Sequence, residues 1–212
     1  MSRNRLAVLF ALLLLATLTM TACNSAELRS WLADAQSYHW GAPALSGDGD
    51  AQPLTQAYSA GGLSVRYPDG WAAGADAMGL FVANSAEALQ RVLAQPEADP
   101  APHDFVLLIF DPVQLAGLAE GDQTPHTFLA TLAAHMMTGG TTIGPIHDAQ
   151  VGPYPGAQAW VSDARRHTEG FLLAWDQDGV LLFMVAAGYT GEADEHHASA
   201  LRIAESVRYQ TP

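Results

Sequence analysis

The chain has 212 residues, with 22 acidic residues against nine arginines and no lysine, so its formal net charge is −13. An acidic surface repels phosphate backbones and does not attract anionic lipid headgroups, which argues against nucleic acid as a partner and against a basic membrane-binding surface. The length allows one domain with a hydrophobic core and a tail, and the lone Cys23 excludes an intramolecular disulfide.

The first 22 residues have the layout of a secretory signal peptide. Arg3 and Arg5 precede the apolar run 6–18, and small residues follow it. The run is short for a membrane span, which needs about 20 apolar residues. Its end, Met20-Thr21-Ala22-Cys23, resembles the bacterial lipobox, in which an aliphatic residue and two small ones precede the cysteine. The resemblance implies that residues 1–22 are removed and that Cys23 carries acyl chains such as palmitate.

Lipidation at Cys23 would hold the protein on the extracytoplasmic side of a bacterial cell envelope, and two or more acyl chains anchor stably. The alternative is an ordinary signal peptide with an incidental cysteine. Which envelope membrane is used is left open. Residues 23–53 are then the lipidated N-terminus and a tether, within which 41–50 is rich in Gly, Pro and Asp and is predicted to be a flexible spacer.

Part of the tether has apolar residues at helical spacing, but its polar face lacks the basic excess of helices that lie in a membrane interface. Docking on the domain or a weakly ordered helix is therefore favoured over membrane insertion. These apolar positions are Leu28, Trp31, Leu32, Ala35 and Tyr38.

The folded domain, predicted over 54–209, begins with a hairpin signature. Residues 54–58 and 63–67 alternate apolar with polar around a Gly-containing turn at 59–62. A turn at 68–71 places Trp71 at one edge of the core. A short apolar strand at 79–83 then leads to a helix that Asn84 or Ser85 caps and that ends at Leu93 or Ala94.

The second half of the domain begins with a continuous apolar run, 105–110, which predicts a central strand buried on both faces. A second helix starts at Thr124-Pro125 and stops at Gly139-Gly140. Strand-like stretches follow, with the clearest tight turn at 176–179, and a last helix covers about 191–207. The strand-like stretches are 141–151, 157–165, 171–176 and 180–187.

The second and the last of the predicted helices each have an apolar stripe that is predicted to pack on the sheet. Strands cluster and helices are few, so the fold class is α+β, with helices packed on a mostly antiparallel sheet. The stripe of the second helix is Phe128, Leu129, Leu132, Ala133 and Met136, and that of the last helix is Ala200, Ile203, Ala204 and Val207.

Three short motifs in the domain resemble the PsbP-like family. Residues 62–71, which end in Tyr-Pro-Asp-Gly-Trp, resemble its opening strand; 151–157 resemble a Gly-x-x-Ala strand entry; and 191–207 resemble its closing helix with a Ser-aliphatic end. The resemblance implies an α/β/α sandwich around an antiparallel sheet. Members include extrinsic photosystem II subunits and bacterial lipoproteins, and the fold usually assembles with other macromolecules. The family's ion ligands have no matching positions here.

The densest cluster of ligand-type side chains is Glu192, Asp194, His196 and His197. Glu192 with His196, or Asp194 with His197, share a helical face and are candidate ligands for a divalent metal. The alternative is a helix start that favours acidic residues, followed by histidines at the edge of the buried stripe.

Arg165 and Arg166 form the only adjacent basic pair after the leader. They are candidate partner-binding residues, together with Trp71. The alternative for the arginines is a solvated turn or a salt bridge. Trp160, Trp175 and Phe183 are predicted core or half-core residues; if exposed with Trp71 or Tyr189, they would form an aromatic patch.

No nucleophile elbow, phosphate loop or dinucleotide fingerprint is present in the sequence. We therefore expect a binding or assembly module without catalytic activity or cofactor, whose partner is another envelope protein. The alternative is a lipoprotein that binds a small ligand or a divalent metal, and an unrecognised hydrolase is a third hypothesis.

Overall fold

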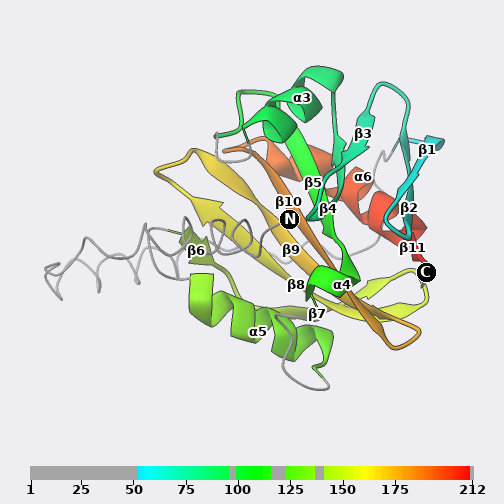
Figure 1. Cartoon of the computed structure of the whole chain (residues 1–212). Coiled ribbons are helices and arrows are strands. Elements are labelled where there is room, and N and C mark those ends of the chain that lie inside the picture. The colour runs from blue at the N-terminus through cyan, green and yellow to red at the C-terminus, as the bar shows by residue number, and fades with distance from the viewer. Residues whose placement is uncertain (1–51, 96–98, 116–122, 137–140, 211–212) are drawn as a thin grey trace, which may run out of the picture. The chain divides into compact units, whose positions relative to one another are not determined.

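The computed structural model describes residues 52–95, 99–115, 123–136 and 141–210. The predicted signal peptide, Cys23 and the tether up to residue 51 lie outside these ranges. The described chain forms a three-stranded sheet of order β1-β2-β11 and an eight-stranded sheet of order β3-β4-β5-β10-β9-β8-β6, in which β7 also pairs with β8 (Figure 1). Every strand pair is antiparallel.

The small sheet is made of β1 (Leu54–Ala60), β2 (Leu63–Pro68) and β11 (Arg208–Tyr209). The strands of the large sheet are β3 (Ala72–Ala75), β4 (Gly79–Ala83), β5 (Phe105–Phe110), β6 (Thr141–Ile143), β7 (His147–Val151), β8 (Tyr154–Asp163), β9 (Thr168–Gln177) and β10 (Val180–Tyr189). The helices are α3 (Ala86–Ala94), α4 (Pro112–Leu115), α5 (Pro125–Met136) and α6 (Ala193–Ser206).

Alternation along the central strands gives the large sheet two apolar faces. In β5, Phe105, Leu107 and Ile109 enter the core cluster shared with α6, whereas Val106 and Leu108 pack in the cluster under α3. Side chains at successive strand positions point to opposite faces, so a continuous apolar run is what a strand covered on both sides needs. The prediction for residues 105–110 is confirmed.

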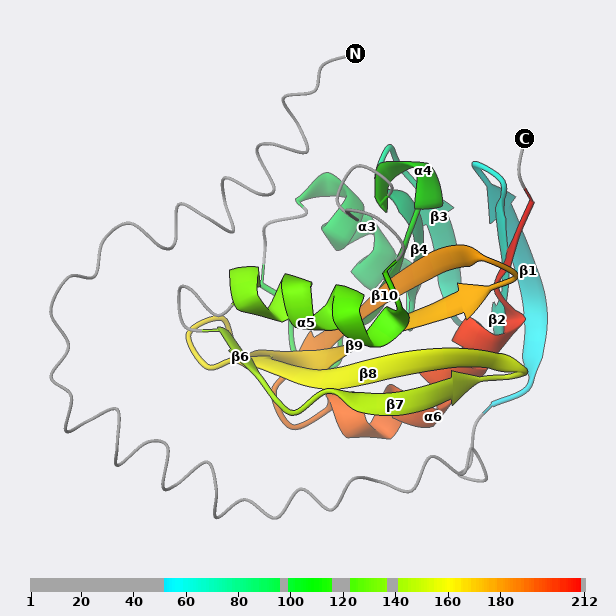
Figure 2. The same cartoon turned by 90° about the horizontal axis from the view of Figure 1, so that it is seen from below.

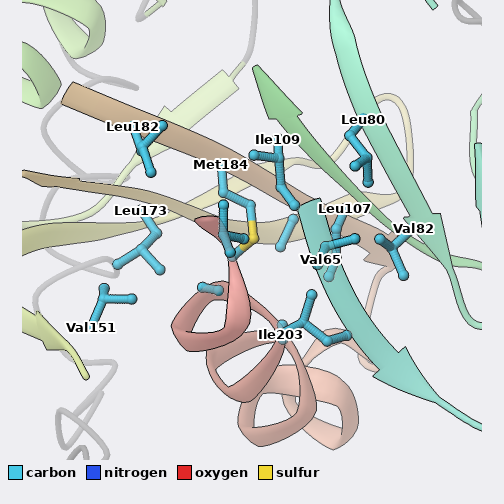
Figure 3. Packing of buried hydrophobic residues seen from close by; sticks show 14 of the residues in the cluster. Val65, Leu80, Val82, Leu107, Ile109, Val151, Leu173, Leu182, Met184 and Ile203 are labelled. Atoms are coloured by element: carbon cyan, nitrogen blue, oxygen red, sulfur yellow. The ribbon is translucent and has the colours of Figure 1, made fainter. Parts of the chain in front are cut away.

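One face is covered by α6 and the small sheet. Val65 of β2 and Ile203 of α6 enter the same cluster as Leu107 and Met184 of the large sheet (Figure 3). Ile203 and Met184 have no exposed surface, and the predicted α6 stripe is buried throughout. Full burial of such a side chain contributes about 1.5–3 kcal/mol, so this layer is a main source of stability.

The opposite face is covered by α3, α4 and α5 (Figures 1 and 2). Ser85 caps α3 by accepting a hydrogen bond from the Ala88 amide at 3.0 Å, and Leu89 of α3 packs on the sheet. Phe128 and Leu129 of α5 pack on another part of the sheet with Phe183. Helices therefore flank both faces, which confirms the predicted α+β sandwich.

Several element boundaries differ from the sequence predictions. The stretch 141–151 is two strands, β6 and β7, and β8 to β10 are longer than predicted. Strand β3 and the short α4 were missed. Strand β3 is Ala-Ala-Gly-Ala, so it has no bulky residue that would mark it as a strand. Its small side chains leave room for α3, because a Cβ at Gly74 would lie 3.2 Å from Leu93 of that helix.

The predicted tight turn between β9 and β10 is confirmed. Asp178 and Gly179 have φ values of 56° and 86°, as a two-residue hairpin turn of the primed type requires. Across the described ranges, the helices are too short or too polar for any of them to span a bilayer.

Candidate functional site

The four predicted metal ligands lie at the start of α6, as expected, but their side chains have different surroundings. The Glu192 carboxylate accepts a hydrogen bond from the His103 amide at 2.6 Å, and its other oxygen lies 3.3 Å from His103 Nδ1. The Asp194 side chain is exposed. Glu192 thus ties α6 to the loop before β5.

His196 is half-buried against aromatic rings of two other segments. Its ring centroid lies 4.8 Å from that of Phe105 and 5.8 Å from that of Trp71. Its Nε2 faces the Asn84 side-chain nitrogen at 3.5 Å. The Asn84 amide is held by the backbone, because Oδ1 accepts from the Phe105 amide at 3.1 Å and Nδ2 donates to the His103 carbonyl at 2.7 Å.

His197, the next residue, faces a different aromatic pair. Its ring centroid lies 4.7 Å from that of Phe171 and 6.2 Å from that of Trp160. These two rings stack on each other across β8 and β9 with 6.2 Å between centroids. Adjacent helical positions point about 100° apart, which explains why the two histidines have separate environments.

Burial lowers the pKa of both histidines below the ordinary value, because the charged imidazolium loses hydration against these rings. Glu195 and Glu192 act in the opposite direction on the pKa of His196, and Asp194 does so for His197. Desolvation outweighs these carboxylates at both positions. Both rings are therefore expected to be neutral near pH 7.

No group of three His, Cys, Asp or Glu side chains with metal-binding spacing occurs within the described ranges. The structure thus gives the metal hypothesis no coordination shell, and the surroundings of the histidines match the alternative of histidines at the edge of a buried stripe. The hypothesis stays a prediction. Calorimetry of the full chain with Zn²⁺ or Mn²⁺ tests it, with His196→Gln as the variant that should abolish any heat of binding.

The predicted partner-binding residues lie on two separate turns. Trp71 is half-buried after β2 and contacts Phe105 edge-to-face at 6.2 Å, so it closes one edge of the core as predicted. Arg165 and Arg166 lie in the turn between β8 and β9, where Asp163 Oδ1 accepts hydrogen bonds from both of their amides. Arg166 also forms an ion pair with Asp99 at 2.7 Å, so its salt-bridge alternative is observed.

The prediction that Trp160, Trp175 and Phe183 are core or half-core residues is confirmed, so the condition for an aromatic patch is not met. Trp175 and Phe183 are buried, and Trp71, Trp160 and Tyr189 are half-buried. Two shallow hollows lie on the surface instead. One is beside α3, lined by Glu87, Gln90, Arg91, Ala94 and Gln95, and the other is around the β1–β2 turn.

Sequence reasoning missed three polar side chains that position α6. Glu169 of β9 accepts hydrogen bonds from the Gly191 and Ala193 amides at the start of α6. Asn84 joins β4 to the His103 loop, although it was considered only as a helix cap. Gln177, buried in β9, donates to the Val207 carbonyl and accepts from the Tyr209 amide. None of the three has a local sequence signal, because all of their partners are distant in the chain.

The chain thus forms a three-layer α+β domain, in which polar side chains fix α6 over an antiparallel sheet. By sequence, the chain matches no protein-family model and no curated protein. Among solved structures, it is similar to the solution structure of cyanobacterial PsbP (CyanoP) from Synechocystis sp. PCC 6803. The match has 13% identity and a TM-score of 0.41, and it covers 76% of this chain and 96% of that one.

That structure is a PsbP protein, and PsbP-like is the family that the three sequence motifs resemble. The likeness is too distant to carry an argument about function.

Proposed function

We propose that this protein is a lipid-anchored, extracytoplasmic binding or assembly module of a bacterial cell envelope, with no catalytic activity of its own. The observation that carries the proposal is the leader, in which two arginines and an apolar run end at the only cysteine of the chain. Acyl chains on Cys23 would attach an acidic domain to a membrane whose anionic headgroups do not attract it.

The contacts of the reactive side chains support a binding role. At the start of α6, the polar groups of Glu192 and Asn84 are engaged with backbone and side chains that hold the fold together. His196 and His197 face aromatic rings. Such contacts stabilise a junction between elements, and they orient none of these groups toward one of the two hollows described above. Recognition of another protein is then a matter of surface shape and charge.

Intact-mass measurement on protein from its own host tests the anchor. We expect a mass that lacks residues 1–22 and includes acyl chains on the new N-terminal residue, and we expect the protein to fractionate with membranes. The matched control is Cys23→Ser, which should leave the leader uncut and the residue unmodified. An unmodified thiol in the wild-type protein would contradict the lipid anchor.

Cross-linking in intact cells followed by affinity purification tests the binding role. We expect a defined envelope protein to be recovered with the anchored wild-type chain. The control is an unrelated lipoprotein of similar charge, which identifies background captured by the acyl chains alone. Recovery of the same proteins with both baits would contradict a specific binding function.

A further inference from the structure

The outer edge of β1 is the longest strand edge without a neighbouring strand in the described chain. Strand β1 has seven residues, whereas the other strands at the ends of the two sheets, β11, β3 and β6, have two, four and three. Figure 2 shows β1 at the rim of the folded unit. An unpaired strand edge presents a row of backbone donors and acceptors that another strand can use.

Strand β1 lacks the usual protection of an exposed edge. Its sequence, Leu-Thr-Gln-Ala-Tyr-Ser-Ala, contains no charged residue and no proline. By contrast, β7, which pairs only with β8, carries His147 and Asp148. The one irregularity of β1, a shift in register with β2, is confined to Leu54–Gln56. Residues 56–60 therefore offer a regular, uncharged edge.

The backbone of Ala57 points toward this free edge. Ala57 lies opposite Arg66 of β2. The Arg66 amide donates to Ser206 Oγ at 2.9 Å and the Arg66 carbonyl accepts from the same hydroxyl at 3.1 Å, so both groups face α6 rather than β1. Opposite residues in an antiparallel pair alternate between bonded and non-bonded pairs. The N–H and C=O of Ala57, and those of Ser59 two residues later, therefore face outward.

The side chain of Arg66 brings a positive charge to β1. Its guanidinium donates to the Leu54 carbonyl at 2.7 Å, which holds the charge against the start of this strand. Arg66 is exposed. A guanidinium has five N–H donors, so one bond to a carbonyl leaves others for a carboxylate.

The charge of the small sheet is opposite to that of the whole chain. Its three strands carry Arg66 and Arg208 and no acidic residue, in a chain of net charge −13. The acidic residues nearby are at its borders. Asp69 follows β2, Glu205 is on α6, and Asp111 Oδ2 lies 3.8 Å from where a Cβ on Gly61 would be, at the hairpin tip.

We propose that an extended acidic segment of a partner protein binds by adding a strand to β1 along Gln56–Ala60, with a carboxylate side chain on the Arg66 guanidinium. The inference rests on the proposed function and names the binding surface and the partner's chemistry. Main-chain hydrogen bonds supply affinity in this mode of recognition, and side-chain contacts supply specificity. A second copy of the chain fits less well, because its own β1 has no carboxylate to meet Arg66.

The test uses the full chain in detergent micelles and fluorescence anisotropy with two labelled peptides of about eight residues, the length of a strand. One alternates Glu with Val and the other alternates Lys with Val. We expect the acidic peptide to bind, the basic peptide not to bind, and added salt to weaken binding because exposed charges are screened. Equal binding of both peptides would overturn the proposal.

Two pairs of variants locate the surface. Ser59→Pro removes an outward N–H from the edge and should abolish binding, whereas Ser59→Thr keeps the N–H and should bind as the wild type does. Arg66→Gln should weaken binding by about fivefold, the size of an exposed charge pair, whereas Arg66→Lys keeps the charge and should weaken binding less. Wild-type affinity in Ser59→Pro would contradict strand addition at this edge.

Arg66→Glu keeps the test decisive where Ser59→Pro does not fold. This variant should reverse the preference and bind the basic peptide. Sedimentation of the wild-type chain tests a second copy as the occupant. The proposal would be overturned if the chain self-associates, if Ser59→Pro abolishes this self-association and if the acidic peptide does not compete with it. Peptide binding is measured independently of the search for a partner in cells. If the peptide does not bind but a specific partner is recovered from cells, this surface is refuted and the proposed function still stands.

Discussion

The two faces of the large sheet are covered in different ways. On one face, α6 and the small sheet share a single apolar cluster with the central strands (Figure 3). Polar side chains of β9 and of α6 itself also hold this helix in place. On the other face, α3 and α5 cover two separate clusters. Each of these two helices has a side-chain cap at its start. Helix α3 also has an ion pair from Arg91 to Asp104, and His126 of α5 hydrogen-bonds to the exposed Asp148.

The difference teaches how register is fixed on each face. Apolar packing tolerates small shifts, because contact energy is not directional. Hydrogen bonds to buried groups tolerate few such shifts, because a buried donor or acceptor that loses its partner costs about 1–3 kcal/mol. Glu169 and Gln177 join the start of α6 and the residue after it to the two ends of β9, and Ser206 joins α6 to β2, so the α6 layer has one defined position.

The largest expected effect comes from truncating the α6 face. Ile203→Ala should lower the free energy of unfolding by about 3 kcal/mol, because a fully buried side chain leaves a cavity in the shared cluster. Hydrogen exchange should show the loss of protection spreading to β2, since Val65 packs in the same cluster. Val113→Ala on α4, where the side chain is 63% exposed, is the control and should cost less than about 0.5 kcal/mol.

A smaller effect should distinguish the polar ties from a local cap. Gln177→Leu leaves the Tyr209 amide without its partner and removes one of the two donors to the Val207 carbonyl, the other being Arg208, and it should cost about 2 kcal/mol in chemical denaturation. Ser85→Ala removes the α3 cap and should cost about 1 kcal/mol. A Gln177→Leu variant as stable as the wild type would show that the α6 face is held by apolar packing alone.

The smallest expected effect is on pH dependence. The folded-state pKa values of His196 and His197 are lowered. As the pH falls through about 6.5, these histidines therefore bind protons in the unfolded chain before they do so in the folded chain. The free energy of unfolding should therefore be lower at pH 5.5 than at pH 7.5. Replacing both histidines by Gln should reduce this difference, and His147→Gln, with an exposed side chain, should not. An unchanged profile in the double variant would refute the assignment.

Most of the elements could be predicted from local patterns. The hairpin, the strand 79–83, the apolar strand 105–110 and the turn before β10 follow from alternation, Gly and Asp placement and runs of apolar residues. Strand β3 could not, because four small residues have no period. Of the candidate site, the position of His196 and His197 at the start of a helix was predictable, but their aromatic neighbours come from four other places in the chain.

The sequence by itself determined the acidic charge, the α+β class and the inward stripes, and it predicts removal of the leader, because each depends on residues close together in the chain. Only the tertiary structure decided that Glu192 contacts His103, that the backbone of Arg66 bonds to Ser206 and not to β1, and that the Arg66 guanidinium binds the Leu54 carbonyl. Those contacts join residues 12 to 140 positions apart. Directional bonds over such separations form only after packing has brought the elements together, so no local pattern specifies them.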